Sequence, residues 1–139
     1  MKTCLVIGLG QFGAAVAKTL CTLDWEVAAV DREKPRVRSI ADAVSLAVTG
    51  DAVQEELLAA LDAGRYDCAV VSFSGDFGDR VPLTMSLKNM GVRQVLCRAD
   101  DPRQGQALLQ IGADRILLPE QESGEWLARE LAKEQECIG

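Results

Sequence analysis

The chain has 139 residues, 48% of them hydrophobic, carries a net charge of −6 at pH 7 and contains no histidine. Its length is that of one ordinary domain with a buried core, and its acidic balance argues against a nucleic-acid or anionic-membrane partner. No apolar stretch approaches the roughly 18 residues that a membrane span needs, so direct insertion into a membrane is not expected.

The first predicted strand, residues 4–7, runs into a glycine-rich loop. Gly8, Gly10 and Gly13 follow it with the spacing Gly-x-Gly-x-x-Gly, at the point where a helix is predicted to begin. We expect Gly8 to form the tight turn, Gly10 to let a pyrophosphate approach the backbone, and Gly13 to let the helix pack on the sheet. The phosphates would then lie on unpaired N–H groups at the start of the helix.

A second apolar run, residues 27–30, ends in Asp31 at the distance from the glycines that dinucleotide-binding folds show. In such folds this carboxylate accepts hydrogen bonds from ribose hydroxyls and disfavours a 2′-phosphate. The pattern therefore predicts a nucleotide-binding β-α-β unit. The alternative is a tight turn in a doubly wound sheet that binds no nucleotide.

Predicted helices and strands alternate through the rest of the chain. Periodicity and capping signals predict helices over 14–23, 35–41, 80–90, 104–111 and 123–136. A further helix is predicted around Leu57, Leu58 and Leu61, after a capping box of Asp51 and Gln54. Strands are predicted over 45–48, 68–72, 94–98 and 115–118. This alternation predicts an α/β fold, a doubly wound, Rossmann-like sheet of six parallel strands with helices on both faces. The loops at the carboxyl ends of the strands would line one ligand-binding edge.

The residues typical of an enzyme are missing. Without histidine, the commonest general base and the usual metal ligand are absent, and neither a catalytic nor a metal site is expected. Tyr66 is the only tyrosine, and Val70 stands where a short-chain dehydrogenase carries its lysine. Cys4, Cys68 and Cys97 lie inside apolar runs, as expected for core thiols in a reducing compartment. A bound nucleotide with nothing to react with indicates regulation.

Five segments resemble a known family. They are the loop from Gly8 to Gly13, Val30-Asp31, Gly50-Asp51-Ala52, Cys97-Arg98-Ala99, and residues 111–120, which read Ile-Gly-Ala-Asp-Arg-Ile-Leu-Leu-Pro-Glu. Together they resemble the N-terminal, TrkA-N domain of regulators of potassium conductance, in particular the cytosolic subunits of the Ktr and Trk potassium-uptake systems. The resemblance covers almost the whole chain, so residues 1–139 are expected to form this one nucleotide-binding domain.

The resemblance implies a nucleotide-sensing regulatory subunit with no catalysis of its own. In that family, ATP, ADP or NAD(H) in the glycine cleft changes the shape of a ring of dimers and so gates a membrane pore subunit for potassium. The implied partners are a second copy of the chain, a larger ring and that pore subunit, which would place the protein in the cytoplasm at the inner membrane. The last helix, from about residue 123, would serve as a crossover or dimerisation helix and would contribute Trp126, Leu127 and Leu131 to the contact.

The resemblance also assigns roles to individual residues. Asp31 would hold the ribose, Asp51 and Ala52 would flank the adenine, and Arg98 and Glu120 would lie near the phosphates or the dimer seam. The expected nucleotide-binding residues are Gly8, Gly10, Gln11, Phe12, Gly13, Asp31, Arg32, Gly50, Asp51, Ala52, Ser72, Phe73, Ser74, Arg98 and Glu120. Structural alternatives exist for some of them: Asp51 as a helix N-cap, and Arg98 with Glu120 as a surface ion pair.

One position departs from the family pattern, and two other functions stay open. ATP-responsive members carry arginine after the second glycine, whereas the uncharged Gln11 favours ADP or NAD(H) over ATP. The alternatives are the cytosolic domain of a potassium-efflux antiporter and the cofactor domain of a dehydrogenase. Turnover of NADH would indicate the enzyme, and a nucleotide-dependent change in dimer geometry would indicate the sensor.

Overall fold

The computed structural model describes residues 2–73 and 77–138, with side chains described as far as residue 135. Its centre is a parallel sheet of six strands in the order β3-β2-β1-β4-β5-β6. The strands are β1 (Thr3–Ile7), β2 (Glu26–Asp31), β3 (Leu46–Thr49), β4 (Cys68–Val71), β5 (Gln94–Arg98) and β6 (Arg115–Leu117). The predicted doubly wound, six-stranded α/β fold is confirmed.

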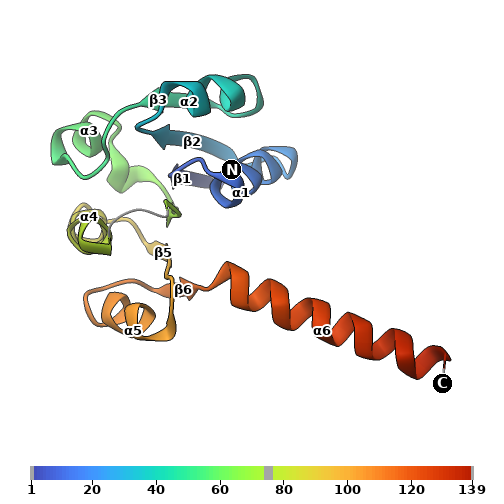
Figure 1. Cartoon of the computed structure of the whole chain (residues 1–139). Helices are drawn as coiled ribbons and strands as arrows, with labels where there is room; N and C mark the ends of the chain where they lie inside the picture. Colours follow the sequence, from blue (N-terminus) through green and yellow to red (C-terminus); the bar gives the residue numbers. More distant parts are fainter. Residues whose placement is uncertain (1, 74–76, 139) are drawn as a thin grey trace.

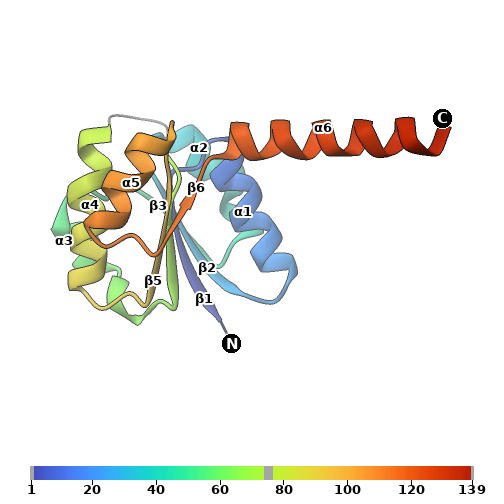
Figure 2. The same ribbon diagram turned by 90° about the horizontal axis from the view of Figure 1, so that it is seen from below.

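Helices cover both faces of this sheet (Figures 1 and 2). They are α1 (Gln11–Thr22), α2 (Lys34–Ile40), α3 (Glu55–Ala60), α4 (Phe77–Asn89), α5 (Pro102–Gln110) and α6 (Pro119–Ile138), with short 3-10 turns at Ala41–Ala43 and Ala63–Arg65. α1 and α2 pack on one face through Ala17, Val37 and Ile40. α3, α4 and α5 pack on the other face through Leu58, Leu83 and Leu108.

The central strands carry apolar side chains on both faces because helices cover both. Every residue of β4 is buried, and Leu5 and Val6 of β1 are fully buried on opposite faces. This is the near-continuous apolar pattern expected of parallel strands inside an α/β fold. β5 differs, since Val95 and Cys97 are fully buried whereas Leu96 and Arg98 on its other face are only half-buried. One face of the sheet is therefore incompletely covered at β5.

α6 leaves that face uncovered because it projects away from the sheet (Figures 1 and 2). Trp126, Leu127 and Leu131 are 62%, 52% and 53% exposed. The helix begins at Pro119, four residues earlier than the predicted start near residue 123. Proline suits the first turn of a helix, where its missing N–H costs no hydrogen bond, and Glu120 and Glu122 in the first turn favour the positive end of the helix dipole. No helix in the described part of the chain combines the length and apolarity of a membrane span.

Two aspartates near the starts of helices have different roles. Asp101 caps α5, because its Oδ1 accepts the backbone N–H of Gln104 at 2.8 Å. The capping box of Asp51 and Gln54 is wrong: Gln54 is itself the N-cap residue of α3 and makes no side-chain cap bond. Oδ1 of Asp51 instead accepts the N–H of Val53 at 3.0 Å, which leaves this carboxylate at the edge of the sheet rather than at a helix end.

Candidate functional site

The glycine loop joins β1 to α1 and has the geometry that its three glycines predict. Gly8 has a φ of +98°, and a Cβ there would lie 2.5 Å from the backbone nitrogen of Phe73. A Cβ on Gly13 would lie 1.9 Å from the carbonyl oxygen of Gly8 and 2.4 Å from Oγ of Ser72. The first glycine therefore makes the tight turn and the third allows α1 to approach the sheet, as predicted.

Gly10 occupies the N-cap position of α1 and faces open space. A Cβ added there would meet no atom within 4 Å. The cap makes no side-chain hydrogen bond, and the first turn of α1 carries no acidic residue. The N–H groups at this helix end and its positive dipole are therefore available to an anion such as a phosphate. Gln11 is exposed beside them, whereas Phe12 is half-buried and packs against the core.

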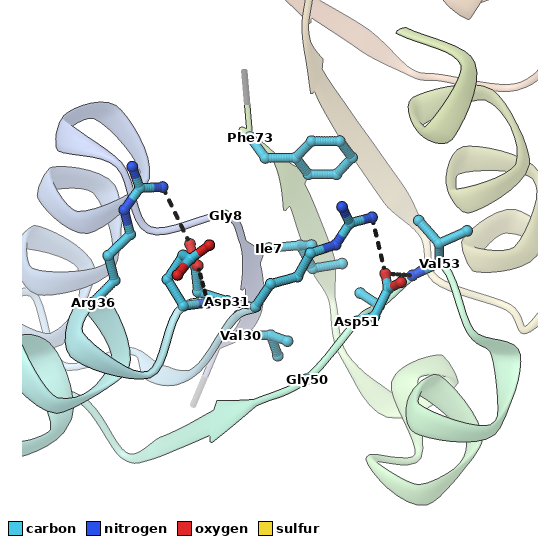
Figure 3. A pocket seen from close by; sticks show the side chains of 12 residues that line it. Ile7, Gly8, Val30, Asp31, Arg36, Gly50, Asp51, Val53 and Phe73 are labelled. Carbon is cyan, nitrogen blue, oxygen red and sulfur yellow. Dashed lines mark hydrogen bonds and ion pairs between the residues drawn. The ribbon is translucent and has the colours of Figure 1, made fainter. Parts of the chain in front are cut away.

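Asp31, at the end of β2, ties the glycine loop to the next loop. Its Oδ2 accepts the N–H of Leu9 at 2.7 Å, and its Oδ1 accepts the N–H of Glu33 at 2.8 Å. Arg36 of α2 places Nη1 3.8 Å from Oδ2, an ion pair drawn in Figure 3. Each carboxylate oxygen has a second lone pair, so Asp31 can hold the loop and accept a ribose hydroxyl at the same time.

A pocket of about 310 Å³ opens between these loops at the carboxyl edge of the sheet. It is lined by Ile7, Gly8, Val30, Asp31, Arg32, Glu33, Arg36, Gly50, Asp51, Ala52, Val53 and Phe73. Figure 3 shows Asp31 and Asp51 on opposite sides of this pocket. Aliphatic and aromatic side chains thus share the pocket with carboxylates, an arrangement suited to a flat apolar ring attached to a hydroxylated sugar.

The charges of the lining nearly cancel. Arg32 spans the pocket, with Nη2 3.1 Å from Oδ1 of Asp51 and 3.3 Å from Oδ2 of Asp79 at the start of α4. Arg36 is engaged with Asp31. With three carboxylates and two guanidinium groups in the lining, this pocket suits the nucleoside part of a ligand better than its phosphates.

The structure brings seven of the predicted site residues into the pocket, namely Gly8, Asp31, Arg32, Gly50, Asp51, Ala52 and Phe73. Gly10, Gln11, Phe12 and Gly13 lie beside it in the first turn of α1 and its N-cap. Ser72 is buried behind the loop, where its Oγ donates to the carbonyl oxygens of Gly8 at 2.6 Å and Ile7 at 3.1 Å. Ser74 lies outside the described residues.

Arg98 and Glu120 do not line the pocket. Arg98, at the end of β5, pairs with Glu120 in the first turn of α6, and the glutamate side chain is 73% exposed. A surface ion pair between these two residues is the structural alternative given above to a contact with the phosphates. The pair links the carboxyl edge of the sheet to the base of α6.

Sequence reasoning missed five lining residues, Ile7, Val30, Glu33, Arg36 and Val53. It also missed Arg80 of α4, whose side chain is fully buried and donates to the carbonyl oxygen of Arg98 at 3.0 Å. A partial signal existed for Arg36, because a short loop after β2 returns the first turn of α2 toward Asp31. No local pattern signals Arg80, since its contacts with Asp100 and Gln104 come from other elements.

Comparison with known proteins places the chain in a family. Residues 4–119 match the TrkA-N domain. The chain belongs to the TrkA-N domain family. Among curated relatives of this TrkA-N chain, Ktr system potassium uptake protein A of Vibrio alginolyticus is 37% identical and Ktr system potassium uptake protein C of Bacillus subtilis is 32% identical. Each alignment covers 94% of the chain but only 59% of the relative.

Solved structures share the fold at lower identity. The TrkA-N domain of the inner membrane protein ybaL from Escherichia coli superposes with a TM-score of 0.83 at 17% identity, covering 94% of this chain and 96% of that one. The Shewanella denitrificans Kef CTD in its AMP-bound form gives 0.78 at 18% identity, covering 95% and 80%. The GsuK channel bound to NAD gives 0.72 at 14% identity, covering 84% of this chain and 21% of the channel.

Proposed function

We propose that this TrkA-N chain is the nucleotide-sensing part of a potassium transport system and binds an adenine nucleotide at the glycine loop. The observation that carries the proposal is the pocket beside that loop, in which Asp31 lies next to apolar walls and an uncapped helix end. The nucleoside occupies the pocket, Asp31 accepts the ribose hydroxyls, and the phosphates lie over Gly10 and the start of α1. Structural neighbours bound to NAD and AMP support this class of ligand.

The site favours ADP or NAD(H) over ATP and over phosphorylated dinucleotides. The Asp31 carboxylate repels a 2′-phosphate. Gln11, exposed at the start of α1, adds no charge for a third phosphate. The helix end supplies the equivalent of about half a positive charge, which suits a diphosphate better than a triphosphate.

The transport role rests on the relatives. The Ktr proteins of Vibrio alginolyticus and Bacillus subtilis that resemble this chain are named as potassium uptake proteins. The sequence carries no catalytic arrangement, so the nucleotide acts as a signal rather than as a substrate. The protein would work from the cytoplasm, bound to a membrane pore subunit.

We further propose that two copies of the chain assemble through α6. The exposed Trp126, Leu127 and Leu131 and the half-covered face of β5 around Leu96 each lack a covering layer within the described chain. A second copy that places its α6 over this face covers both surfaces at once. The base of α6 adjoins the Arg98 and Glu120 pair, so a change at the carboxyl edge of the sheet can reach the dimer contact.

Calorimetric titration of the purified protein with ADP, NADH, ATP and NADPH tests the binding proposal. We expect ADP and NADH to bind at least as tightly as ATP, and NADPH to bind more weakly than NADH. Failure of all four to bind would reject the nucleotide site. Steady oxidation of NADH in the presence of small carbonyl compounds would instead favour the dehydrogenase alternative.

A further inference from the structure

A second groove lies at the edge of the sheet opposite the nucleotide pocket. Its volume is about 450 Å³, and it is lined by Lys2, Trp25, Asp67, Cys68, Arg93 and Gln94. These residues lie at or next to the amino-terminal ends of β1, β2, β4 and β5. Nζ of Lys2 lies 5.9 Å from the centre of the Trp25 ring. The groove therefore combines a thiol, two cationic side chains and an opening to solvent.

Cys68 has a second cysteine beside it in the sheet. β1 and β4 are parallel neighbours, and their register pairs Cys4 directly with Cys68. Paired residues on adjacent strands point to the same face, and both thiols belong to the apolar cluster under α1 and α2. Sγ of Cys68 donates to the carbonyl oxygen of Thr3, the residue before Cys4, at 3.9 Å.

The environments of the two thiols differ. Cys68 is 8% exposed and lines the groove, whereas Cys4 is fully buried. The interaction with Cys4, helped by the charge of Lys2, lowers the pKa of Cys68 although burial and Asp67 oppose this. The interaction with Cys68 and burial raise the pKa of Cys4. Cys68, which lines the groove, is therefore the thiol that ionises more readily and that a solute can reach.

We propose that Cys68 and Cys4 form a dithiol that peroxide oxidises reversibly, with Cys68 reacting first and Cys4 resolving the product. The Cys68 thiolate attacks one oxygen of hydrogen peroxide, the O–O bond breaks, and sulfenic acid and water form after protonation. The sulfur of Cys4 then attacks the Cys68 sulfur, an S–S bond forms, and the S–O bond breaks to release a second water. Two thiols lose two electrons, and one peroxide is reduced to two waters.

The register of the two strands suits a disulfide between these residues. Neighbouring strands lie about 4.7 to 4.9 Å apart, which is within the roughly 4.4 to 6.8 Å that separates the Cα atoms of disulfide-bonded cysteines. Cys4 is the second residue of β1 and Cys68 the first of β4, so any adjustment of the backbone falls at the strand ends.

Peptide mapping tests the proposal cleanly, because trypsin places each of the five cysteines in a separate peptide. The wild-type protein is treated with hydrogen peroxide, blocked with iodoacetamide and digested without reduction. We expect a cross-linked species of residues 3–18 with residues 66–80, formed within one chain and removed by dithiothreitol. Cross-links only between chains, or none between these peptides, would overturn the proposal.

Cys97 provides the internal control. It is fully buried, and burial raises the pKa of its thiol, so it should resist both peroxide and alkylation. In the untreated folded protein we expect iodoacetamide to modify Cys68 at least about tenfold faster than Cys97. Equal rates for the two thiols would contradict the assignment of Cys68 as the reactive group.

Two variants separate the two steps. Cys4→Ser should still form sulfenic acid at Cys68, which dimedone traps, but should form no cross-link. Cys68→Ser should show neither product at these positions. Dimedone labelling of Cys4 in the Cys68→Ser variant would show that Cys4 itself reacts with peroxide, and this would reject the proposed roles. Circular dichroism checks that each variant is folded, and the wild-type mapping stands without either variant.

Discussion

Asp31 illustrates how one side chain can serve both the fold and the site. Its two oxygens accept N–H groups from Leu9 and Glu33, which fixes the glycine loop relative to β2. The sequence predicted only the ribose contact. Because the carboxylate already has backbone partners, it is held in place before a ligand arrives, and this lowers the cost of ordering the site.

Replacing Asp31 should therefore weaken nucleotide binding without abolishing the fold. Asp31→Asn keeps the size of the side chain but removes its charge and one acceptor, and we expect a loss of about 1.5 to 3 kcal/mol for ADP and NADH. Titration calorimetry measures the loss. Asp42→Asn, at an exposed aspartate outside the pocket, is the matched control and should bind as the wild type does. Unchanged ADP affinity in Asp31→Asn would contradict the ribose contact.

Gly10 and Gly13 provide a pair with opposite expected effects. Gly13→Ala forces a methyl group against the carbonyl of Gly8, so we expect a loss of about 1 to 3 kcal/mol in the free energy of unfolding. Gly10→Ala meets open space and should leave stability nearly unchanged while weakening nucleotide binding, because the methyl group enters the phosphate position. Urea unfolding and titration of both variants measure these effects. Equal destabilisation by the two changes would show that the loop packs differently.

Gln11 determines the expected choice between nucleotides. Gln11→Arg places a charge beside the first turn of α1 and should strengthen ATP binding by about 1 to 2 kcal/mol through a charge-assisted hydrogen bond, with a smaller effect on NADH. Competition titrations of ATP, ADP and NADH against both proteins measure the difference, with Gln11→Met as the uncharged control. A wild-type preference for ATP of about tenfold, or 1.4 kcal/mol, would refute the charge argument.

At the level of elements, single side chains join helices and strands that lie apart in the sequence. Arg80 of α4 is buried, and it donates to the carbonyl of Arg98 and pairs with Asp100 at 3.3 Å. Asp114, just before β6, joins α4 and β5 at the amino-terminal edge of the sheet. Its Oδ2 accepts the N–H of Val95 at 2.8 Å and Nζ of Lys88 at 2.9 Å.

Asp114 should make stability depend on pH in the acid range. Burial raises its pKa, but the Val95 N–H and the charge of Lys88 outweigh burial and hold the pKa below its usual value. A lowered native pKa means that the contribution is present above the unfolded value of about 3.9 and is lost as the pH falls through the native pKa. Urea unfolding between pH 7 and pH 2.5 should show Asp114→Asn less stable at neutral pH, with the gap closing below about pH 4. A gap that stays constant with pH would exclude this role.

At the level of the whole molecule, the direction of α6 is the main feature. This helix of 20 residues carries an exposed tryptophan and two exposed leucines and leaves a face of β5 half-covered. Within the described part of the chain, no layer packs on either of these apolar surfaces. Tryptophan is enriched among the residues that anchor interfaces. The exposed helix and the exposed sheet face therefore belong to one expected contact between two copies.

Replacing Trp126 tests that contact. Trp126→Ala should raise the dissociation constant of the dimer by at least about tenfold, since interface anchors contribute more than about 1 to 2 kcal/mol, while the melting temperature of the monomer changes little. Light scattering over a concentration series measures the mass. Glu125→Ala, a change at an exposed residue on the opposite face of the same helix, serves as the control. A wild-type protein that stays monomeric at millimolar concentration would end the dimer proposal.

Neighbouring residues in the sequence account for most of the fold and the centre of the site. The alternation of strands and helices, the turn at Gly8, the close packing at Gly13 and the position of Asp31 all follow from local patterns, because periodicity and turn geometry depend on residues close in the chain. Local patterns predicted the helix boundaries less accurately. α6 begins at Pro119 because a proline can enter a helix at its first turn, and this competes with the later serine as a start signal.

Other features exist only because the strand order brings distant segments together. The order β2-β1-β4 places Cys4 beside Cys68 and sets Phe73 against Gly8. The path of α2 returns Arg36 to Asp31, and α4 buries Arg80 against the end of β5. No local pattern encodes these contacts, since each depends on how elements far apart in the chain pack against one sheet. The same holds for α6, whose exposed side chains become significant only because the helix leaves the sheet instead of covering it.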